Sequence, residues 1–211
     1  MNLSRLSENK FSVGVVIFNL LFSLVLVIFF VNVVIFMGCF SAGERVNPVA
    51  TELVRLVVYG SSEREGLNTV SARISLLDTS GNEISVIERS WLGSYLSIEF
   101  MCADIYGKRY YFPYMVKGTE TIAEKGSFSI KRKGTCLFPY FIDNGRCFLY
   151  AQPDERSRKD FYMISRLSKN PVAFYLTKNA FRTDVNFARC ENGAYYGIYS
   201  LEDGKLVLER E

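Results

Sequence analysis

Apolar residues run without interruption by charge from residue 11 to residue 38, in the stretch FSVGVVIFNLLFSLVLVIFFVNVVIFMG. A helix of this length reaches roughly 42 Å, which is more than the roughly 30 Å hydrocarbon core of a bilayer. Strands rarely exceed about ten residues, so the length favours a helix despite the abundant Val and Ile. The pattern predicts a transmembrane helix over 11–38 that follows a short tail, 1–10.

Two other interpretations of this stretch are weaker. A cleaved export signal has an apolar region of roughly 7–15 residues, about half the length of this one. The order Gly38-Cys39 is compatible with a lipoprotein cleavage site, but Phe36 stands where such sites favour leucine. We therefore expect an uncleaved anchor in the lipid bilayer, with lipidation of Cys39 as the alternative.

The charges that flank the apolar stretch predict its orientation. Arg5 and Lys10 precede it, whereas Arg45 on the far side directly follows Glu44. Positively charged flanks stay in the cytoplasm. The tail is therefore expected in the cytoplasm, and the rest of the chain in the periplasm or the extracellular space.

Three polar residues inside the apolar stretch fall on one stripe of a helix. Ser12, Asn19 and Ser23 are separated by seven and four positions. Polar side chains in lipid favour contact with another helix, worth roughly 0.6–2 kcal/mol, so the stripe predicts a helix–helix contact with a second copy or another subunit. The alternative is that these side chains bond to backbone carbonyls one turn earlier.

A linker and one domain follow the predicted anchor. Gly43 and Pro48 break the helical pattern, so we expect a linker over 39–52 and a domain over 53–211. The domain begins with stretches that alternate between apolar and polar residues, as strands of a half-buried sheet do. The polar stretch DTSGN separates two of them, which predicts a hairpin. Its core-facing residues are predicted as Val70, Ala72, Ile74 and Leu76 before the turn, and Ile84 and Val86 after it.

Residues 155–169 carry the one helical pattern of the domain. Phe161, Ile164 and Leu167 recur at helical spacing among charged residues, and Asn170-Pro171 ends the pattern. Short strands separated by turns make up the rest. The fold class predicted is therefore mainly β: one N-terminal transmembrane helix and an antiparallel β-sandwich or barrel-like domain with one short helix.

Several local features refine this prediction. Asn144-Gly145 suits the positive φ angles of a two-residue hairpin turn. Pro113 and Pro139 interrupt apolar runs, which places their strands at an edge or a bulge. The stretches 127–133 and 172–178 are interpreted as further strands.

The domain contains four cysteines, and two states are open for them. In an oxidising compartment, Cys102, Cys136, Cys147 and Cys190 provide for two disulfides. A turn at Asn144-Gly145 would place Cys147 opposite Ile142, too far from Cys136 for a bridge within that hairpin. The alternative is a set of free thiols, with Cys102 in the core. A zinc site is not expected, because the chain has no C-x-x-C motif.

Charge and composition narrow the classes of function. The 25 Lys and Arg residues nearly balance the 22 Asp and Glu residues, so nucleic acid is not expected as a partner. The chain has no histidine, which removes Ser–His and Cys–His nucleophile pairs and histidine metal ligands. We expect neither a cofactor nor enzymatic activity. The weaker enzyme alternative rests on carboxylates that pair in space, with Glu88, Glu99, Asp104 and Asp184 as candidates.

Two aromatic stretches, RYYFPYM and AYYGIY, are the candidates for a partner surface. Neighbouring residues of a strand point to opposite faces, so Tyr111 and Met115 are expected outward, as is one of Tyr195 and Tyr196. The alternative is that both faces are covered. Exposed tyrosine is enriched in protein contacts. We therefore expect a non-enzymatic envelope or surface protein that binds another protein or a second copy, with an aromatic-lined ligand cleft as the alternative.

Overall fold

A computed structural model describes residues 3–64, 67–119, 134–150, 154–187 and 191–210 of the chain. Within these ranges the side chains of residues 3–12, 63–64, 67 and 176 are not described. The chain divides into two compact units, Met1–Gly38 and Cys39–Glu211. Each unit is described by itself.

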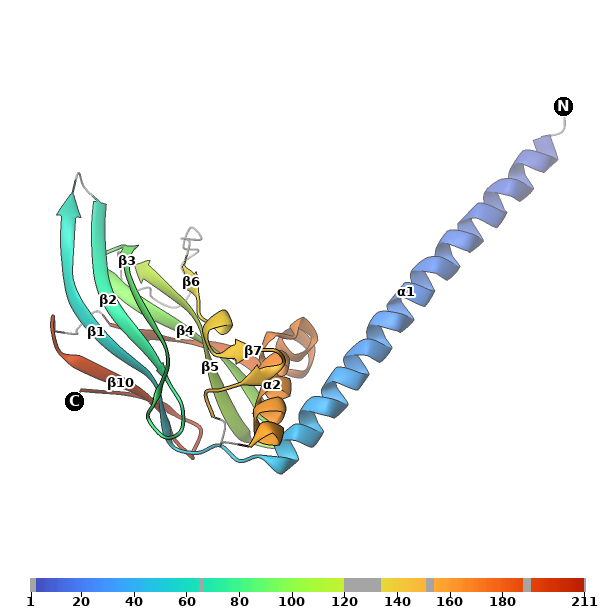
Figure 1. Ribbon diagram of the computed structural model, residues 1–211. Coiled ribbons are helices and arrows are strands. Elements are labelled where there is room, and N and C mark those ends of the chain that lie inside the picture. Colours follow the sequence, from blue (N-terminus) through green and yellow to red (C-terminus); the bar gives the residue numbers. More distant parts are fainter. Residues whose placement is uncertain (1–2, 65–66, 120–133, 151–153, 188–190, 211) are drawn as a thin grey trace. The chain divides into compact units, whose positions relative to one another are not determined.

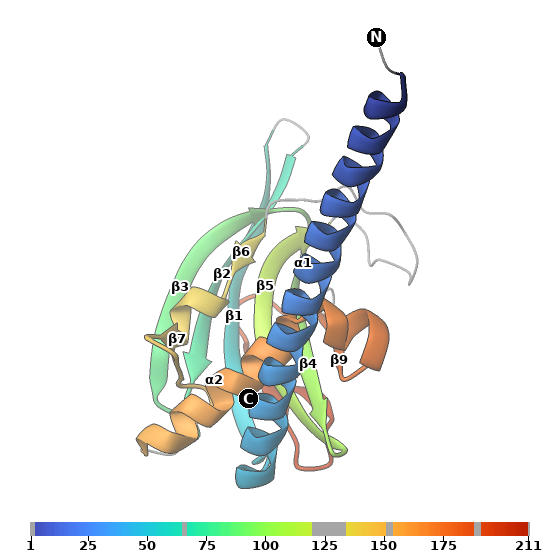
Figure 2. The same cartoon turned by 90° about the vertical axis from the view of Figure 1, so that its right-hand side faces the viewer.

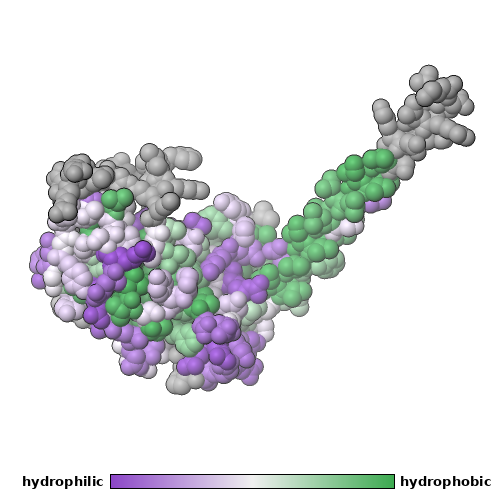
Figure 3. All heavy atoms as spheres, turned by 45° about the horizontal axis from the view of Figure 1, so that its top comes forward, coloured by the Kyte–Doolittle hydropathy of each residue, from purple (hydrophilic) through white to green (hydrophobic). Residues whose placement is uncertain are grey.

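The described part of the first unit is one helix, which agrees with the helix predicted over 11–38 but begins within the predicted tail. Helix α1 (Leu3–Arg45) carries exposed apolar side chains along its described part before residue 39. Figure 3 shows this apolar surface as a continuous green band, whereas hydrophilic residues are spread over the visible part of the domain. By length and composition, Val13–Arg45 is able to cross a membrane, which suggests a membrane anchor or a signal sequence.

The last turns of α1 belong to the second unit, which differs from the linker predicted over 39–52. Cys39 and Ala42 are fully buried in the domain. A Cβ on Gly43 would lie 2.6 Å from the Ile105 side chain, so only glycine permits this close packing. The helix therefore continues to Arg45 because tertiary contacts outweigh the weak helix propensity of glycine.

Two antiparallel sheets form most of the domain (Figure 1). The five-stranded sheet has the order β11-β10-β1-β2-β3 and the four-stranded sheet the order β6-β5-β4-β9. The strands of the first sheet are β1 (Thr51–Arg64), β2 (Leu67–Leu77), β3 (Glu83–Leu92), β10 (Tyr195–Ser200) and β11 (Leu206–Arg210). Those of the second are β4 (Tyr95–Ile105), β5 (Lys108–Thr119), β6 (Thr135–Cys136) and β9 (Ala180–Asn186). The predicted mainly-β fold class is confirmed.

Apolar residues of both sheets meet in the core. The buried set includes Leu56, Val70, Ala72, Ile74 and Leu76 of the first sheet and Leu96, Ile98, Phe100 and Cys102 of the second. Hydrogen bonds also join the sheets. The Trp91 indole donates to the Thr135 hydroxyl at 3.0 Å, and the Tyr111 hydroxyl donates to the Gly204 carbonyl at 2.8 Å.

Helix α2 (Glu155–Lys169) lies across the four-stranded sheet (Figure 2) and confirms the prediction for 155–169. The Asp154 carboxylate caps its first turn by accepting from the Ser157 N–H. Phe161, Ile164 and Leu167 are buried, as their spacing predicted.

Tyr150 fills the space beside α2 and covers the open edge of β5. Its ring stacks on Phe161 at 5.2 Å, and its hydroxyl donates to the Tyr111 carbonyl at 2.8 Å. The same hydroxyl accepts from the Tyr111 N–H at 3.0 Å. One side chain thereby satisfies both backbone groups that a further strand would have paired.

Turn and bulge predictions are mostly confirmed. Asn144 and Gly145 have φ angles of 45° and 75° in the hairpin of β7 (Ile142–Asp143) and β8 (Arg146–Cys147). The register of β4 and β5 shifts next to Pro113. Pro139 instead lies in a 3-10 turn, η1 (Phe138–Tyr140), where its fixed φ angle suits the first positions.

Two strand predictions are wrong. Val86 points outward, because the register of β2 and β3 shifts between Leu76 and Leu77 and leaves Ile87 as the buried residue. Residues 172–178 form no strand; they contain a π-helical turn, η2 (Ala173–Thr177). The Asn170 side chain accepts from the Val172 N–H at 2.8 Å and starts this turn. The strand predicted over 127–133 lies outside the described residues.

Candidate functional site

A hollow of about 200 Å³ lies on the outer face of the five-stranded sheet, the face turned away from the core. Residues of β1, β2, β3 and β10 line it, namely Arg55, Val57, Tyr59, Arg73, Ser75, Glu83 and Tyr195. We call this set the outer-face hollow. The alternation of β1 explains its composition, since Leu56 and Val58 point into the core and Val57 and Tyr59 therefore point out.

Two exposed tyrosines border the outer-face hollow. Val57 pairs with Tyr195 across β1 and β10, and Tyr59 follows Val57 on the same face. The two tyrosines are therefore diagonal neighbours, with 54% of Tyr59 and 52% of Tyr195 exposed. Val57 is almost fully buried and forms an apolar floor near them.

Charged side chains hold the opposite side of the hollow in place. The Arg73 guanidinium contacts both Glu83 carboxylate oxygens at 3.0 and 3.1 Å, and the Ser75 hydroxyl donates to Glu83 at 2.6 Å. The Ser75 hydrogen bond and the Arg73 charge hold the pKa of Glu83 below its usual value. The Tyr59 hydroxyl donates to Glu88 at 3.0 Å. The hollow is thus a preorganised surface of tyrosine, arginine and carboxylate groups.

The structure separates the four residues predicted for a partner surface. Tyr195 is exposed, and Met115 is half-buried on the other sheet. Tyr111 is buried, which corrects its expected outward orientation, whereas Tyr196 is buried next to the exposed Tyr195, so this pair shows one ring on each face as the alternation predicts. Tyr111 packs edge-on against Phe181, and the Tyr196 hydroxyl accepts from the Glu191 N–H. Tyr59 was not among the predicted surface residues, although the alternation of apolar and polar residues in β1 indicates that it points outward.

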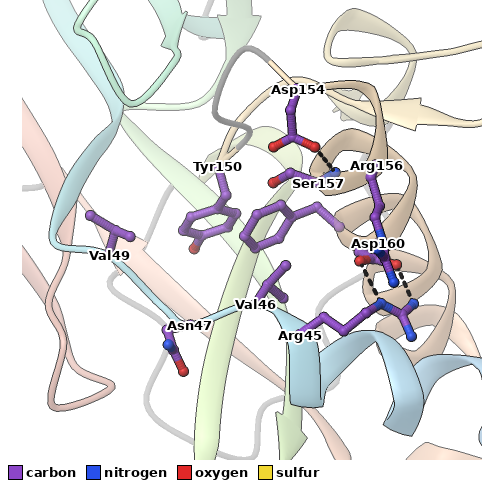
Figure 4. A pocket seen from close by; sticks show the side chains of 10 residues that line it. Arg45, Val46, Asn47, Val49, Tyr150, Asp154, Arg156, Ser157 and Asp160 are labelled. Carbon is purple, nitrogen blue, oxygen red and sulfur yellow. Dashed lines mark hydrogen bonds and ion pairs between the residues drawn. The ribbon is translucent and has the colours of Figure 1, made fainter.

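A second, larger hollow of about 620 Å³ lies between the end of α1 and the start of α2 (Figure 4). Its lining is an even mixture of polar and apolar surface and consists of Arg45, Asn47, Asp154, Arg156, Ser157 and Asp160, with Val46, Val49, Tyr150 and Phe161. Asp154 caps α2, and Asp160 binds Arg45, so both carboxylates are engaged (Figure 4). The size suits a small ligand, but two of the ten lining residues, Tyr150 and Phe161, are aromatic, which is fewer than expected for the aromatic-lined cleft of a ligand-binding module.

The carboxylates considered for catalysis are also engaged in ion pairs or hydrogen bonds. Glu99 contacts Lys117 and Arg182, and Asp184 contacts the same Lys117. Glu88 contacts Arg73 and Tyr59, and Asp104 contacts Arg109. The contacts of these four carboxylates are typical of ion-pair networks at a protein surface.

The cysteines are free thiols wherever the structure describes them. Cys102 and Cys147 are buried, and Cys136 is exposed. Cys190 lies outside the described residues, so a disulfide to it stays a prediction. Cys147 pairs with Ile142, as the turn at Asn144-Gly145 predicted. Cys39 is buried near the C-terminal end of α1, with its thiol 3.1 Å from the Met163 carbonyl, and lipidation of Cys39 stays the alternative prediction. No cluster of metal-ligating side chains occurs among the described residues.

The polar stripe of α1 is only partly described. Asn19 and Ser23 are exposed on the helix, and the side chain of Ser12 lies outside the described residues. Asn32, on another face, donates to the Ile28 carbonyl at 2.8 Å. In this single chain the helix–helix contact stays a prediction.

Comparison of the whole chain with protein families, curated proteins and solved structures finds no match. The candidate function therefore rests on the physical features of the chain itself.

Proposed function

We propose that this protein is a single-pass membrane protein that presents its β-domain outside the cytoplasm and binds another protein there. The contact surface in this proposal is the outer-face hollow, with Tyr59 and Tyr195 as its anchors. The observation that carries the proposal is the exposure of these two neighbouring rings beside an apolar floor at Val57.

The chemistry of the outer-face hollow suits protein binding. Tyrosine and arginine are the residues most enriched among the energetic centres of protein interfaces. A tyrosine ring supplies a large contact area and a polar hydroxyl while losing little side-chain entropy. Arg73 is already held by Glu83, so a partner does not have to order it.

The anchor would serve binding by confinement. A domain held near one membrane meets partners of the same membrane at a high effective concentration, so a weak contact suffices. In this role the long apolar helix raises occupancy without contributing to the interface.

Affinity purification from gently solubilised membranes tests the binding surface. The double variant Tyr59→Ala/Tyr195→Ala should reduce recovery of co-purifying protein by at least about ten-fold, because it removes both anchors of the interface. Tyr175→Ala is the matched control, since Tyr175 is also exposed but lies in η2. Equal recovery with the double variant, or recovery of this protein alone from the wild type, would contradict the proposal.

Protease protection tests the orientation. Intact spheroplasts or cells should lose the domain to added protease, and inverted vesicles should protect it, because Arg5 and Lys10 favour a cytoplasmic tail. Digestion only from the cytoplasmic face would reverse the proposed topology.

A further inference from the structure

Two segments of the domain pack against the residues that directly follow the predicted anchor. The Cys39 thiol donates to the Met163 carbonyl of α2 at 3.1 Å. The Phe40 ring lies 5.3 Å from the Tyr106 ring in the turn between β4 and β5. The Tyr106 hydroxyl also donates to Glu44 at 3.3 Å. The middle of α2 and the β4–β5 turn therefore flank the start of the domain.

Because these contacts involve residues that directly follow the apolar stretch in the sequence, their distance from the hydrocarbon core of the bilayer can be bounded. Cys39 is the first residue after the apolar stretch 11–38. The headgroup layer on each side of the hydrocarbon core is about 5–8 Å thick. With the apolar stretch embedded, side chains in direct contact with Cys39 and Phe40 lie in this layer or at its edge.

Tyr106 has the properties of an interfacial residue. It is 61% exposed, so its ring is accessible at the domain surface. Its φ angle is 55°, a left-handed conformation that costs a non-glycine residue roughly 1–2 kcal/mol. A glycine or asparagine would hold this turn with less strain, so the ring itself has a use there. Tyrosine is enriched at the headgroup level, where its apolar ring and polar hydroxyl both find partners.

Helix α2 also places a cation, Arg166, near Cys39. Arg166 is exposed, lies three residues after Met163 on α2, and is close enough to Cys39 to act on its thiol electrostatically. Among the described carboxylates none forms an ion pair with Arg166. A guanidinium that pairs with none of the described carboxylates matches, at this depth, the charge and the geometry of a lipid phosphate.

Given the membrane anchoring proposed above, we infer that this domain contacts the lipid surface directly through the β4–β5 turn and α2. Tyr106 and Phe40 insert among the headgroups, and Arg166 binds a lipid phosphate. The membrane is then a second binding surface of the domain, separate from the outer-face hollow, and it limits how the domain reorients above the bilayer.

Fluorescence quenching by lipids tests the inference. The full chain is reconstituted in phosphatidylcholine vesicles that contain phosphatidylglycerol and a spin label close to the headgroup. Tyr106→Trp and Arg166→Trp place reporters at the two contacts, and the native Trp91, which is buried, supplies the baseline. Tyr59→Trp is the control, at an exposed site roughly 26 Å along β1 from Thr51.

The added emission at positions 106 and 166 should fall by roughly half in the spin-labelled vesicles, and that at position 59 should change little. Quenching at 106 and 166 that does not exceed quenching at 59 would overturn the inference. Flotation of the vesicles separates this failure from failure of anchoring. A chain that floats but is not quenched is anchored without surface contact, whereas a chain that does not float refutes the anchor itself. Tyr106→Trp and Arg166→Trp report on lipid contact independently, so if one variant fails to fold, the other still tests the inference.

Discussion

The guanidinium group of Arg45 binds the carboxylate of Asp160 through two hydrogen bonds, at 2.9 Å from Nε and 2.5 Å from an Nη (Figure 4). Asp160 is buried and Arg45 is partly exposed. Lys108 adds to the same junction, because its ammonium donates to the Gly43 and Val46 carbonyls at the C-terminus of α1. A cation there also interacts favourably with the helix dipole. These bonds fix the last turn of α1 to the domain.

Removal of Arg45 should destabilise the domain, because it leaves the buried Asp160 carboxylate without its partner. For Arg45→Met we expect a loss of about 1–3 kcal/mol in the free energy of unfolding. The double variant Arg45→Met/Asp160→Leu should recover most of that loss, since no buried charge remains. Urea denaturation of the full chain in nanodiscs, followed by Trp91 fluorescence, measures both. Additive losses in the double variant would show that the pair is not coupled.

Tyr150→Phe should destabilise the domain although the ring is kept. The variant removes one hydroxyl and leaves the Tyr111 N–H and carbonyl without partners in a buried place, at a cost of about 1–3 kcal/mol. The same denaturation experiment measures the change. Tyr175→Phe is the control, because Tyr175 is largely exposed. Equal stabilities of the two variants would argue against this role of the hydroxyl.

Cysteine alkylation should distinguish the thiols at pH 8. Cys136 is exposed and should react with iodoacetamide. Burial raises the pKa of Cys147 to about 12 and that of Cys102 above its usual value, so both hold almost no thiolate and are shielded from the reagent. Mass spectrometry of the native chain reads the labelled positions. Rapid labelling of Cys147 without denaturant would contradict the packing described above.

Asn19→Leu should weaken association of the anchor with another helix, if Asn19 supplies the predicted contact. The expected loss is about 0.6–2 kcal/mol, or roughly three- to thirty-fold in affinity. Energy transfer between labelled chains in vesicles measures self-association, and crosslinking measures association with another subunit. Asn32→Leu is the matched control, because the Asn32 side chain donates to the Ile28 carbonyl. Indistinguishable variants would remove the support for the stripe.

Local sequence patterns were sufficient to predict an element where the residues that determine its structure lie within that element. The spacing of Phe161, Ile164 and Leu167 fixes the buried face of α2, and Asn170 caps the end of the helix through its backbone N–H, which donates to the Leu167 carbonyl. The alternation from Val70 to Leu76 likewise orients β2. In each case the periodicity and the end signals lie within a few residues of one another.

The remaining features depend on partners that are distant in the sequence. Residues 39–45 stay helical because Ile105 and Asp160 receive them, and neither partner is visible in the local pattern. Val86 turns outward because Ile84 is an extra residue of β3 opposite the step from Leu76 to Leu77, which is visible only in the pairing with β2. Tyr59 borders the outer-face hollow only after β10 pairs with β1. Sequence periodicity predicts faces, but sheet pairing decides which faces are covered.

The hydroxyl of Tyr150 also has a consequence for copies of the protein that crowd together. Membrane-anchored chains collide often in a fixed orientation. An unpaired strand edge would then allow strand pairing between neighbouring chains. The Tyr150 hydroxyl bonds to the N–H and the carbonyl of Tyr111, so this part of the β5 edge is not available to another chain, and a high surface density need not lead to aggregation there.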